Sequence, residues 1–168
     1  MDDLMNNLFY ATNLEGLLTQ EQILSMSGYE FMKGILHGNH PAPPICQTMN
    51  FALHEVEDGK VVFQGSPSFE HCNPIGTVHG GWYGTLLDSC MACAVMTRVP
   101  QGSVYTTLEY KINILRPIPT GLVVQGIGKI DHSGRSTGVA HGEIIGLEDG
   151  KLYATGSTTC IIMRRERN

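Results

Sequence analysis

Residues 71–88 carry the clearest signal of the fold and read His-Cys-Asn-Pro-Ile-Gly-Thr-Val-His-Gly-Gly-Trp-Tyr-Gly-Thr-Leu-Leu-Asp. Glycines at positions 76, 80 and 81 let the backbone turn sharply and come close to a ligand. His79-Gly80-Gly81 stands where a helix is expected to begin, and a helix N-terminus offers unpaired N–H groups and a partial positive charge. Such groups can stabilise an oxyanion, which is often the largest single contribution to catalysis.

Asp88 follows Gly81 by seven residues, which is about 10 Å along a helix. Its neighbours in the sequence are apolar, and burying a carboxylate among them is costly unless it has a partner or a function. Simpler explanations stay open for each residue. Asp88 could lie on the solvent side of the helix, and the glycines could serve close packing. Asn73 could be a turn residue before Pro74, and His79 could cap the helix or bond a backbone carbonyl.

The patterns along the chain predict an α+β domain. Thr19-Gln20-Glu21-Gln22 is a capping-box sequence with apolar residues behind it at helical spacing, so we expect a helix that ends near Gly38. Prolines at 41, 43 and 44 should then give a stiff, extended connection. A longer helix is expected over residues 80–97. Strands are expected over 48–56, 60–66, 103–115, 122–131, 135–147 and 151–163, with Glu57-Asp58-Gly59 as a hairpin turn between the first two.

The segment before Pro117 alternates with a period of two, as a half-buried strand does. The alternation predicts two faces. The apolar face would carry Leu108, Tyr110, Ile112 and Ile114, and the opposite face would carry Thr107, Glu109, Lys111 and Asn113.

The composition limits the classes of partner and compartment. Only 16% of the 168 residues are charged, so we expect part of the surface to be buried against other subunits. A net charge of −5 argues against nucleic-acid and anionic-membrane binding. We see no secretory signal and no membrane-spanning run, and the five scattered cysteines suggest reduced thiols in the cytoplasm. Cys90 and Cys93 form a C-x-x-C without a second pair, so we favour buried thiols over metal or redox chemistry.

Taken together, these features resemble a known family. The pattern Asn-Pro-x-Gly-x-x-His-Gly-Gly over residues 73–81, with an acidic residue nine positions after the histidine, is similar to that of hotdog-fold acyl-CoA thioesterases of the phenylacetate-pathway (PaaI-like) type. The resemblance extends from about Gly28 to the last expected strand. It implies a hotdog fold, in which an antiparallel sheet wraps around a long central helix. Residues 1–18 would be an N-terminal extension, and 19–168 a single hotdog thioesterase domain.

The resemblance also implies catalytic roles. Asp88 would act as general base on water or as nucleophile on the thioester carbonyl. The Gly80 backbone N–H would polarise that carbonyl, and Asn73 would help to hold the carbonyl or the attacking water. A hydroxyl on the next strand would orient the water; Thr107 fits the family spacing, with Thr106 as the alternative.

Members of the family share their active sites between two subunits, so the resemblance implies a homodimer or homotetramer. Asn73 and Gly80 would come from one chain, and Asp88 and Thr107 from the other, while His79 would shape the pocket rather than transfer protons. Further residues expected to contact the acyl group or coenzyme A are Gly81, Trp82, Arg116, Arg135, Ser136 and Arg164. Trp82 could instead be a core residue, and the arginines could be surface charges. No metal or cofactor is implied, because coenzyme A is part of the substrate.

The function expected from this resemblance is hydrolysis of acyl-CoA thioesters to a free carboxylic acid and coenzyme A. One alternative is a hotdog hydratase or dehydratase that acts on acyl thioesters, although the order of Asn73, His79 and Asp88 favours hydrolysis. A second alternative is a non-catalytic acyl-CoA-binding module. Such modules usually carry an appended DNA-binding helix pair, for which the roughly 18 residues before the first helix are too few.

Overall fold

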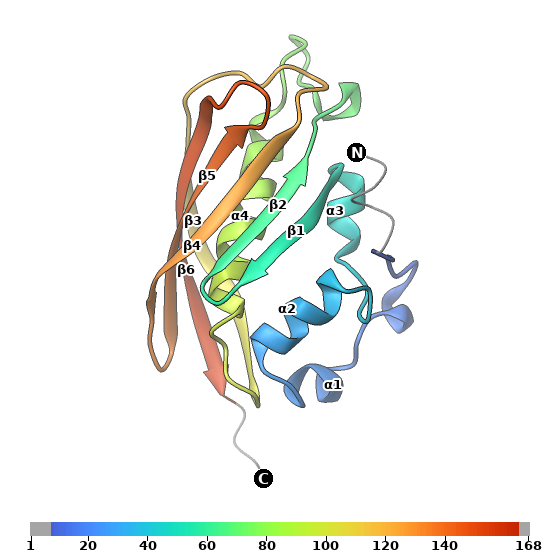
Figure 1. Ribbon diagram of the computed structural model, residues 1–168, viewed down its shortest axis with the longest axis vertical. Helices are drawn as coiled ribbons and strands as arrows, with labels where there is room; N and C mark the ends of the chain where they lie inside the picture. Colours follow the sequence, from blue (N-terminus) through green and yellow to red (C-terminus); the bar gives the residue numbers. More distant parts are fainter. Residues whose placement is uncertain (1–7, 165–168) are drawn as a thin grey trace.

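The computed structural model of the chain describes residues 8–164. One long helix, α4 (Gly80–Met96), lies against a six-stranded sheet that curves around it (Figure 1). The strand order is β1-β2-β4-β5-β6-β3, and every neighbouring pair is antiparallel. The strands are β1 (Phe51–Glu57), β2 (Lys60–Gly65), β3 (Ser103–Ile114), β4 (Val124–Ser133), β5 (Thr137–Gly146) and β6 (Leu152–Arg164). This confirms the predicted α+β architecture with an antiparallel sheet around one helix.

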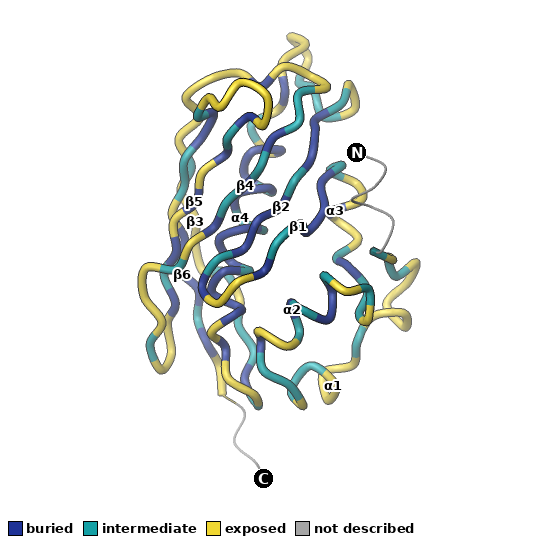
Figure 2. Tube along the Cα trace, viewed as in Figure 1, coloured by how far each residue is buried: buried dark blue, intermediate teal, exposed yellow. Residues whose placement is uncertain are grey.

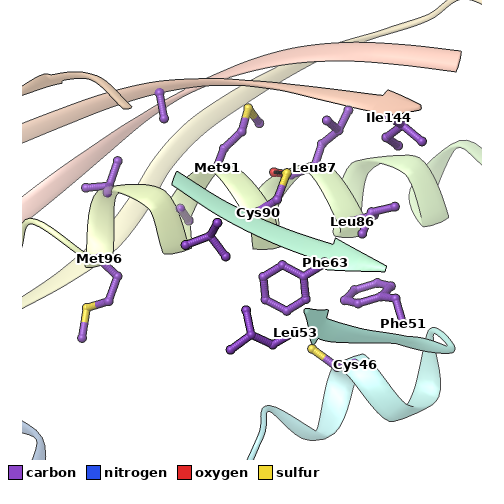
Figure 3. Packing of buried hydrophobic residues seen from close by; sticks show 14 of the residues in the cluster. Cys46, Phe51, Leu53, Phe63, Leu86, Leu87, Cys90, Met91, Met96 and Ile144 are labelled. Atoms are coloured by element: carbon purple, nitrogen blue, oxygen red, sulfur yellow. Dashed lines mark hydrogen bonds between the residues drawn. The ribbon is translucent and has the colours of Figure 1, made fainter. Parts of the chain in front are cut away.

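The hydrophobic core lies between α4 and the sheet. Most side chains of α4 are buried, which is typical of a helix that is covered on all sides. Leu87 and Met91 point toward Ile144 of β5, whereas Phe63 of β2 and Leu53 of β1 lie on the other side of the helix (Figure 3). The buried part of the chain follows α4 and the inner positions of the strands (Figure 2).

Glycines in the sheet let α4 approach the strands at backbone distance. A Cβ atom at Gly128 of β4 would lie 2.1 Å from the carbonyl oxygen of Cys90, so no other residue fits without moving the helix. Gly142 of β5 has the same function toward Met91, because a Cβ atom there would lie 2.7 Å from its Cγ. The glycines of β4 and β5 therefore set the helix-to-sheet distance.

The first predicted helix is two helices. The capping box at Thr19 is confirmed, but α1 (Gln20–Leu24) stops, and α2 (Gly28–Leu36) begins with a capping box of its own. The Ser27 N–H donates to the Glu30 carboxylate at 2.8 Å, and the Glu30 N–H donates to the Ser27 hydroxyl at 3.3 Å. Ser27 is in the extended conformation, as an N-cap residue must be, and this ends the continuous helix.

The proline-rich connection is also partly helical. Pro44 is the first residue of a short helix, α3 (Pro44–Thr48), since proline is well suited to the first helical position. The predicted start of the first strand at Thr48 is therefore wrong, and β1 begins at Phe51. Between them, Asn50 adopts a left-handed conformation with φ 53°, and its side-chain amide donates to the Ser66 carbonyl at 2.8 Å.

The hairpin turn predicted at Glu57-Asp58-Gly59 is confirmed. Glu57 pairs with Lys60 across the turn, and Gly59 has a φ of 80°, which only glycine adopts at little cost. The later strands lie within two or three residues of the predicted bounds.

The simple alternation predicted for β3 is wrong, because a β-bulge interrupts it. Thr107 pairs with Cys160 and Glu109 pairs with Thr159, so Leu108 is an extra residue on β3. Beyond the bulge, the opposite set of alternating residues faces α4. Thr107 before it and Tyr110 after it both reach α4, the first by a hydrogen bond and the second by contact with Gly84.

The segment before α1 lies along the helical side of the molecule. The Ala42 N–H donates to the Phe9 carbonyl at 2.8 Å, and Tyr10 forms a parallel bridge with Ala42. Leu8 and Tyr10 pack against the hydrophobic core, and a short 3₁₀-helix follows at Leu14–Gly16. Within residues 8–164, no helix is both long and apolar enough to cross a membrane.

The helix-to-sheet distance can be tested at Gly128. Gly128→Ala should lower the free energy of unfolding by about 1–3 kcal/mol, because the added methyl group overlaps the Cys90 carbonyl. Guanidinium unfolding followed by circular dichroism measures the change. Lys129→Ala, at the exposed neighbouring position, is the control and should change it by less than about 0.5 kcal/mol. Equal effects of the two substitutions would contradict the close approach.

Candidate active site

A half-buried carboxylate lies at the centre of α4. The Thr107 hydroxyl on β3 donates to Asp88 Oδ1 at 3.0 Å. Of the two neighbouring threonines that the sequence offered, Thr107 is therefore the one bonded to Asp88. Thr106 lines the same cleft but is exposed.

The surroundings of Asp88 make it a better base than a carboxylate in water. Burial raises the pKa of Asp88, and the hydrogen bond from Thr107 lowers it by a smaller amount. No salt bridge to Asp88 occurs among the described residues. The charged carboxylate is therefore stabilised by one hydroxyl and by no cation among the described residues, so it takes up a proton more readily than a carboxylate in water.

Asp88 opens into a cleft between α4 and β3 with a volume of about 270 Å³. The cleft is lined by Asp88, Ser89, Ala92, Cys93, Tyr105, Thr106 and Thr107. Sequence reasoning missed Tyr105 and Cys93. The signal for Tyr105 was available, because it is two residues before Thr107 and so shares its face of β3.

The N-terminus of α4 is capped by His79. The Gly81 N–H donates to His79 Nδ1 at 2.8 Å, so this nitrogen is the unprotonated one in the structure. The capping role that the sequence left open is thus the observed one. Among the described residues, the hydrogen bonds of this turn leave the Gly80 N–H without an acceptor, whereas the Gly81 and Trp82 N–H groups are both used. Gly80 is therefore the free donor of this helix end.

Asn73 organises the loop that leads to α4. Its side-chain oxygen accepts from the Ile75 N–H at 3.1 Å and from the Thr77 N–H at 3.2 Å, and its amide donates to the Thr77 hydroxyl at 2.8 Å. This is the turn role that the sequence allowed. A side-chain amide has two N–H donors, so one is left for a ligand.

A second cleft, of about 320 Å³, lies at this end of the helix. It is lined by Met49, Glu70, His71, Cys72, His79, Gly81, Trp82 and Thr85. The Trp82 ring is buried to 1% exposure, and its indole N–H donates to the Met49 carbonyl at 2.8 Å. The tryptophan therefore forms an apolar wall of this cleft and has no free polar atom for a ligand.

The two halves of the predicted site are separated within one chain. Asp88 follows Gly80 by eight residues, which is about 12 Å along α4. A thioester carbonyl that accepts from the Gly80 N–H is therefore out of reach of Asp88 in the same chain. Within one chain, Thr107 is bonded to Asp88, whereas Asn73 bonds only to its own loop, which leads to Gly80 at the start of α4.

The residues predicted to meet coenzyme A lie at opposite ends of the sheet. Arg164 pairs with Ser103 at the start of β3, and the Ser136 carbonyl nearby accepts from the Ile162 N–H. Arg116 follows the other end of β3, and its guanidinium donates to the Leu152 carbonyl at 2.6 Å. Arg135, next to Ser136 in the β4–β5 hairpin, is exposed. Within residues 8–164, no group of three His, Cys, Asp or Glu residues is placed to hold a metal ion.

Comparison with known proteins gives a consistent result. The sequence pattern of the thioesterase superfamily matches residues 75–153. Human acyl-coenzyme A thioesterase 13 is 27% identical over 101 residues, which cover 60% of this chain and 71% of that protein.

Solved structures agree in fold. A phenylacetic acid degradation-related protein from Ralstonia eutropha is 28% identical, with a TM-score of 0.71 over 78% of this chain and 98% of that one. A variant of the phenylacetic acid degradation protein PaaI from Thermus thermophilus is 26% identical, with a TM-score of 0.64 over 70% and 97% of the two chains. The sheet wrapped around α4 is therefore the hotdog fold, as expected.

The hydrogen bond at Asp88 leads to a test of its pKa. Thr107→Val should raise the pKa of Asp88 further, because the bond from Thr107 favours the charged carboxylate. The carboxyl carbon signal of Asp88, assigned by its loss in Asp88→Asn, reports the pKa in an NMR titration. Thr107→Ser should preserve the wild-type value, and so should Thr106→Val. An unchanged pKa in Thr107→Val would show that the bond is absent in solution.

Proposed function

We propose that the chain hydrolyses acyl-CoA thioesters to a carboxylic acid and coenzyme A, because residues 75–153 match the thioesterase superfamily. The observation that carries the proposal is the half-buried Asp88 held by Thr107 at the edge of a cleft. The name of the human relative, an acyl-coenzyme A thioesterase, supports coenzyme A as the thiol.

The free N–H of Gly80 polarises the thioester carbonyl. It lies at the N-terminus of a 17-residue helix, where the helix dipole adds a partial positive charge. Negative charge develops on the carbonyl oxygen as the tetrahedral intermediate forms, so a fixed donor there stabilises the transition state more than the substrate. Asn73 contributes its remaining amide N–H to the carbonyl or to the attacking water, and His79 fixes the turn.

Asp88 supplies the nucleophile by one of two routes. It either takes a proton from water as the water attacks the carbonyl, or attacks the carbonyl itself to form a mixed anhydride that water then opens. In both routes the carbon–sulfur bond breaks and the thiol leaves. The raised pKa suits the first route, since a more basic carboxylate removes a proton more effectively. Water is the co-substrate, and the proposal needs no metal or other cofactor.

The active site is formed by two copies of the chain. Asp88 with Thr107 from one subunit meets Gly80 with Asn73 from its partner, which removes the separation of about 12 Å along α4. Within residues 8–164, strand β3 is an edge of the sheet, and it carries exposed apolar side chains, with Leu108 59% and Tyr110 47% exposed. A long apolar edge is a liability unless another strand or chain covers it. Pairing through β3 covers this edge and brings Thr107 to the interface.

Arginines at the rim contact the phosphates of coenzyme A. Arg135, Ser136 and Arg164 form one group at the start of β3, and Arg116 lies at the other end. About eleven residues of strand, or roughly 36 Å, separate the two places within a chain. A single coenzyme A therefore meets one of these places from a given subunit, and Gly81 and Trp82 line the cleft at the helix N-terminus.

The catalytic roles can be tested by removing one group at a time. Asp88→Asn should lower kcat by roughly 10²–10⁴, the usual contribution of a general base. Asp131→Asn, an exposed aspartate in the β4–β5 hairpin, is the matched control and should keep full activity. Release of free thiol from a panel of acyl-CoAs measures hydrolysis. Near-normal turnover by Asp88→Asn would show that Asp88 is not the catalytic carboxylate.

Gly80 offers a pair of variants that differ in the donor. Gly80→Pro removes the N–H, and proline is well tolerated at the first position of a helix, so kcat should fall by roughly 10²–10³. Gly80→Ala keeps the N–H, and its Cβ would lie 3.5 Å from the nearest atom of Ile114, which is an ordinary contact. The alanine variant should therefore be active. Equal activity of the two variants would exclude the Gly80 N–H as the donor.

Mixed subunits test whether the site is shared. In a dimer of one Asp88→Asn chain and one Gly80→Pro chain, one of the two sites combines an intact Gly80 with an intact Asp88. Dimers isolated with two different affinity tags should regain about half of the wild-type activity, although each parent dimer is inactive. Mixed dimers without activity would place the whole site in one chain.

A further inference from the structure

A smaller, more enclosed cavity lies next to the Asp88 cleft. It has a volume of about 120 Å³ and is lined by Phe31, Met32, Ile35, Pro43, Leu53, Phe63, Cys93, Met96 and Tyr105. Met96, Leu53 and Phe63 lie on the same side of α4, the side that faces away from Ile144 and β5 (Figure 3). Phe31, Met32 and Ile35 of helix α2 form a further wall. This wall precedes residues 75–153, the part of the chain that matches the thioesterase superfamily.

The cavity and the Asp88 cleft share two lining residues, Cys93 and Tyr105. These two side chains therefore border both the cleft that holds the carboxylate and the apolar space. Burial raises the pKa of the Cys93 thiol to about 12, so the thiol is neutral at physiological pH. The boundary thus presents a neutral thiol and a tyrosine ring to whatever enters from the cleft.

The chemistry of the cavity suits a hydrocarbon and not water. Its lining is apolar apart from the Cys93 thiol and the Tyr105 hydroxyl, and an apolar cavity of this kind stays dry. For comparison, a cavity of about 150 Å³ lined by aliphatic and aromatic side chains binds benzene. An empty cavity also deprives its lining of contacts that a bound group would restore.

The position of the cavity sets the length of the group that reaches it. Cys93 lies five residues beyond Asp88 on α4, about 7.5 Å further, and Met96 lies eight residues beyond, about 12 Å further. An extended alkyl chain advances about 1.3 Å per carbon, given bond lengths near 1.5 Å. A chain that starts at the reacting carbonyl therefore enters the cavity after about six carbons and fills it at about ten.

We propose that this cavity, walled by α2, receives the far end of the acyl group and selects unbranched apolar acyl chains of about six to ten carbons. This proposal rests on the proposed acyl-CoA hydrolysis. The Tyr105 side chain stands at the entrance and turns aside when the chain enters. Short acyl groups end in the cleft and gain nothing from the cavity, and longer groups reach beyond Met96, the lining residue of α4 that is furthest from Asp88.

Two substitutions of Ile35 change the cavity in opposite directions. Ile35→Phe fills it, and kcat/KM for octanoyl-CoA should fall at least tenfold while that for butyryl-CoA changes by less than about twofold. Ile35→Ala enlarges it, and the preferred chain should become longer. A general loss of stability cannot make the preferred acyl chain shorter in one variant and longer in the other. Leu36→Phe is the matched control, because Leu36 is partly buried beside Ile35 but does not line the cavity.

The wild-type protein should show kcat/KM rising at least tenfold from acetyl-CoA to octanoyl-CoA, with no further rise at hexadecanoyl-CoA. Hydrolysis with no dependence on chain length, or with equal effects of Ile35→Phe on all chains, would overturn the role of the cavity and leave the proposed function standing.

Binding of a free acid separates the two proposals. Octanoate should raise the Tm of the wild type and of Leu36→Phe, but not that of Ile35→Phe. If no acyl-CoA is hydrolysed and octanoate still stabilises the wild type selectively, the cavity binds hydrocarbon chains and the proposed hydrolysis is wrong. If octanoate stabilises Ile35→Phe as well as the wild type, the chain does not bind in this cavity.

Discussion

Helix α4 rests on the backbone of β4 and β5, where Gly128 leaves no space for a side chain between helix and sheet. Much of the remaining geometry follows from this contact. The close approach fixes the depth at which α4 lies, and the apolar side chains around it fill the space to the neighbouring strands. Because such close packing keeps the helix from sliding or tilting against the sheet, its N-terminus and Asp88 have fixed positions. The donor and the base that we propose are therefore held in place before the reaction, which removes the need for reorganisation during it.

Asp88 is the one acidic residue of α4, and its burial works against folding. The free-energy cost of burying this carboxylate is partly offset by a hydrogen bond from one hydroxyl, that of Thr107. Thr107 faces α4 because β3 has a bulge at Leu108. Such a local cost persists where the surrounding structure imposes it, and such sites are common at active centres. The bulge also changes which side chains of β3 are left on its outer face, so one irregularity affects both the surroundings of Asp88 and the edge of the sheet.

The sequence was sufficient for the architecture and for naming Asn73, Gly80 and Asp88 as candidate site residues. The spacing of Asn73, Gly80 and Asp88 pointed to one family, and strand alternation with turn residues located the six strands. What it could not supply was the contact between elements. A bulge such as that at Leu108 depends on pairing with β6, about fifty residues later, so the alternation of β3 alone predicted the wrong face for Thr107. The cavity beneath α2 draws its lining from several distant segments and leaves no local pattern.

The predicted bounds of the helices before β1 were wrong for a different reason. Ser27-Gly28-Tyr29-Glu30 has the same capping signature as the segment at Thr19, but the helical spacing of the apolar residues continued across it. Periodicity and capping therefore gave conflicting signals, and the capping hydrogen bonds decided the boundary. At Pro44 the fixed φ angle of proline was compatible with both an extended segment and the first turn of a helix.

The strand order has a consequence for the order of events during folding. Strand β3 is completed at Ile114, but its partner in the sheet is β6, which begins at Leu152. A growing chain therefore carries an unpaired β3 until residues 152–164 have left the ribosome, and the sheet closes only then. Contacts that join distant parts of the sequence form slowly, because the loop between them must be ordered first. Strand β6 thus completes the described sheet, and shortening it would remove the pairing partner of β3, the strand that carries Thr107.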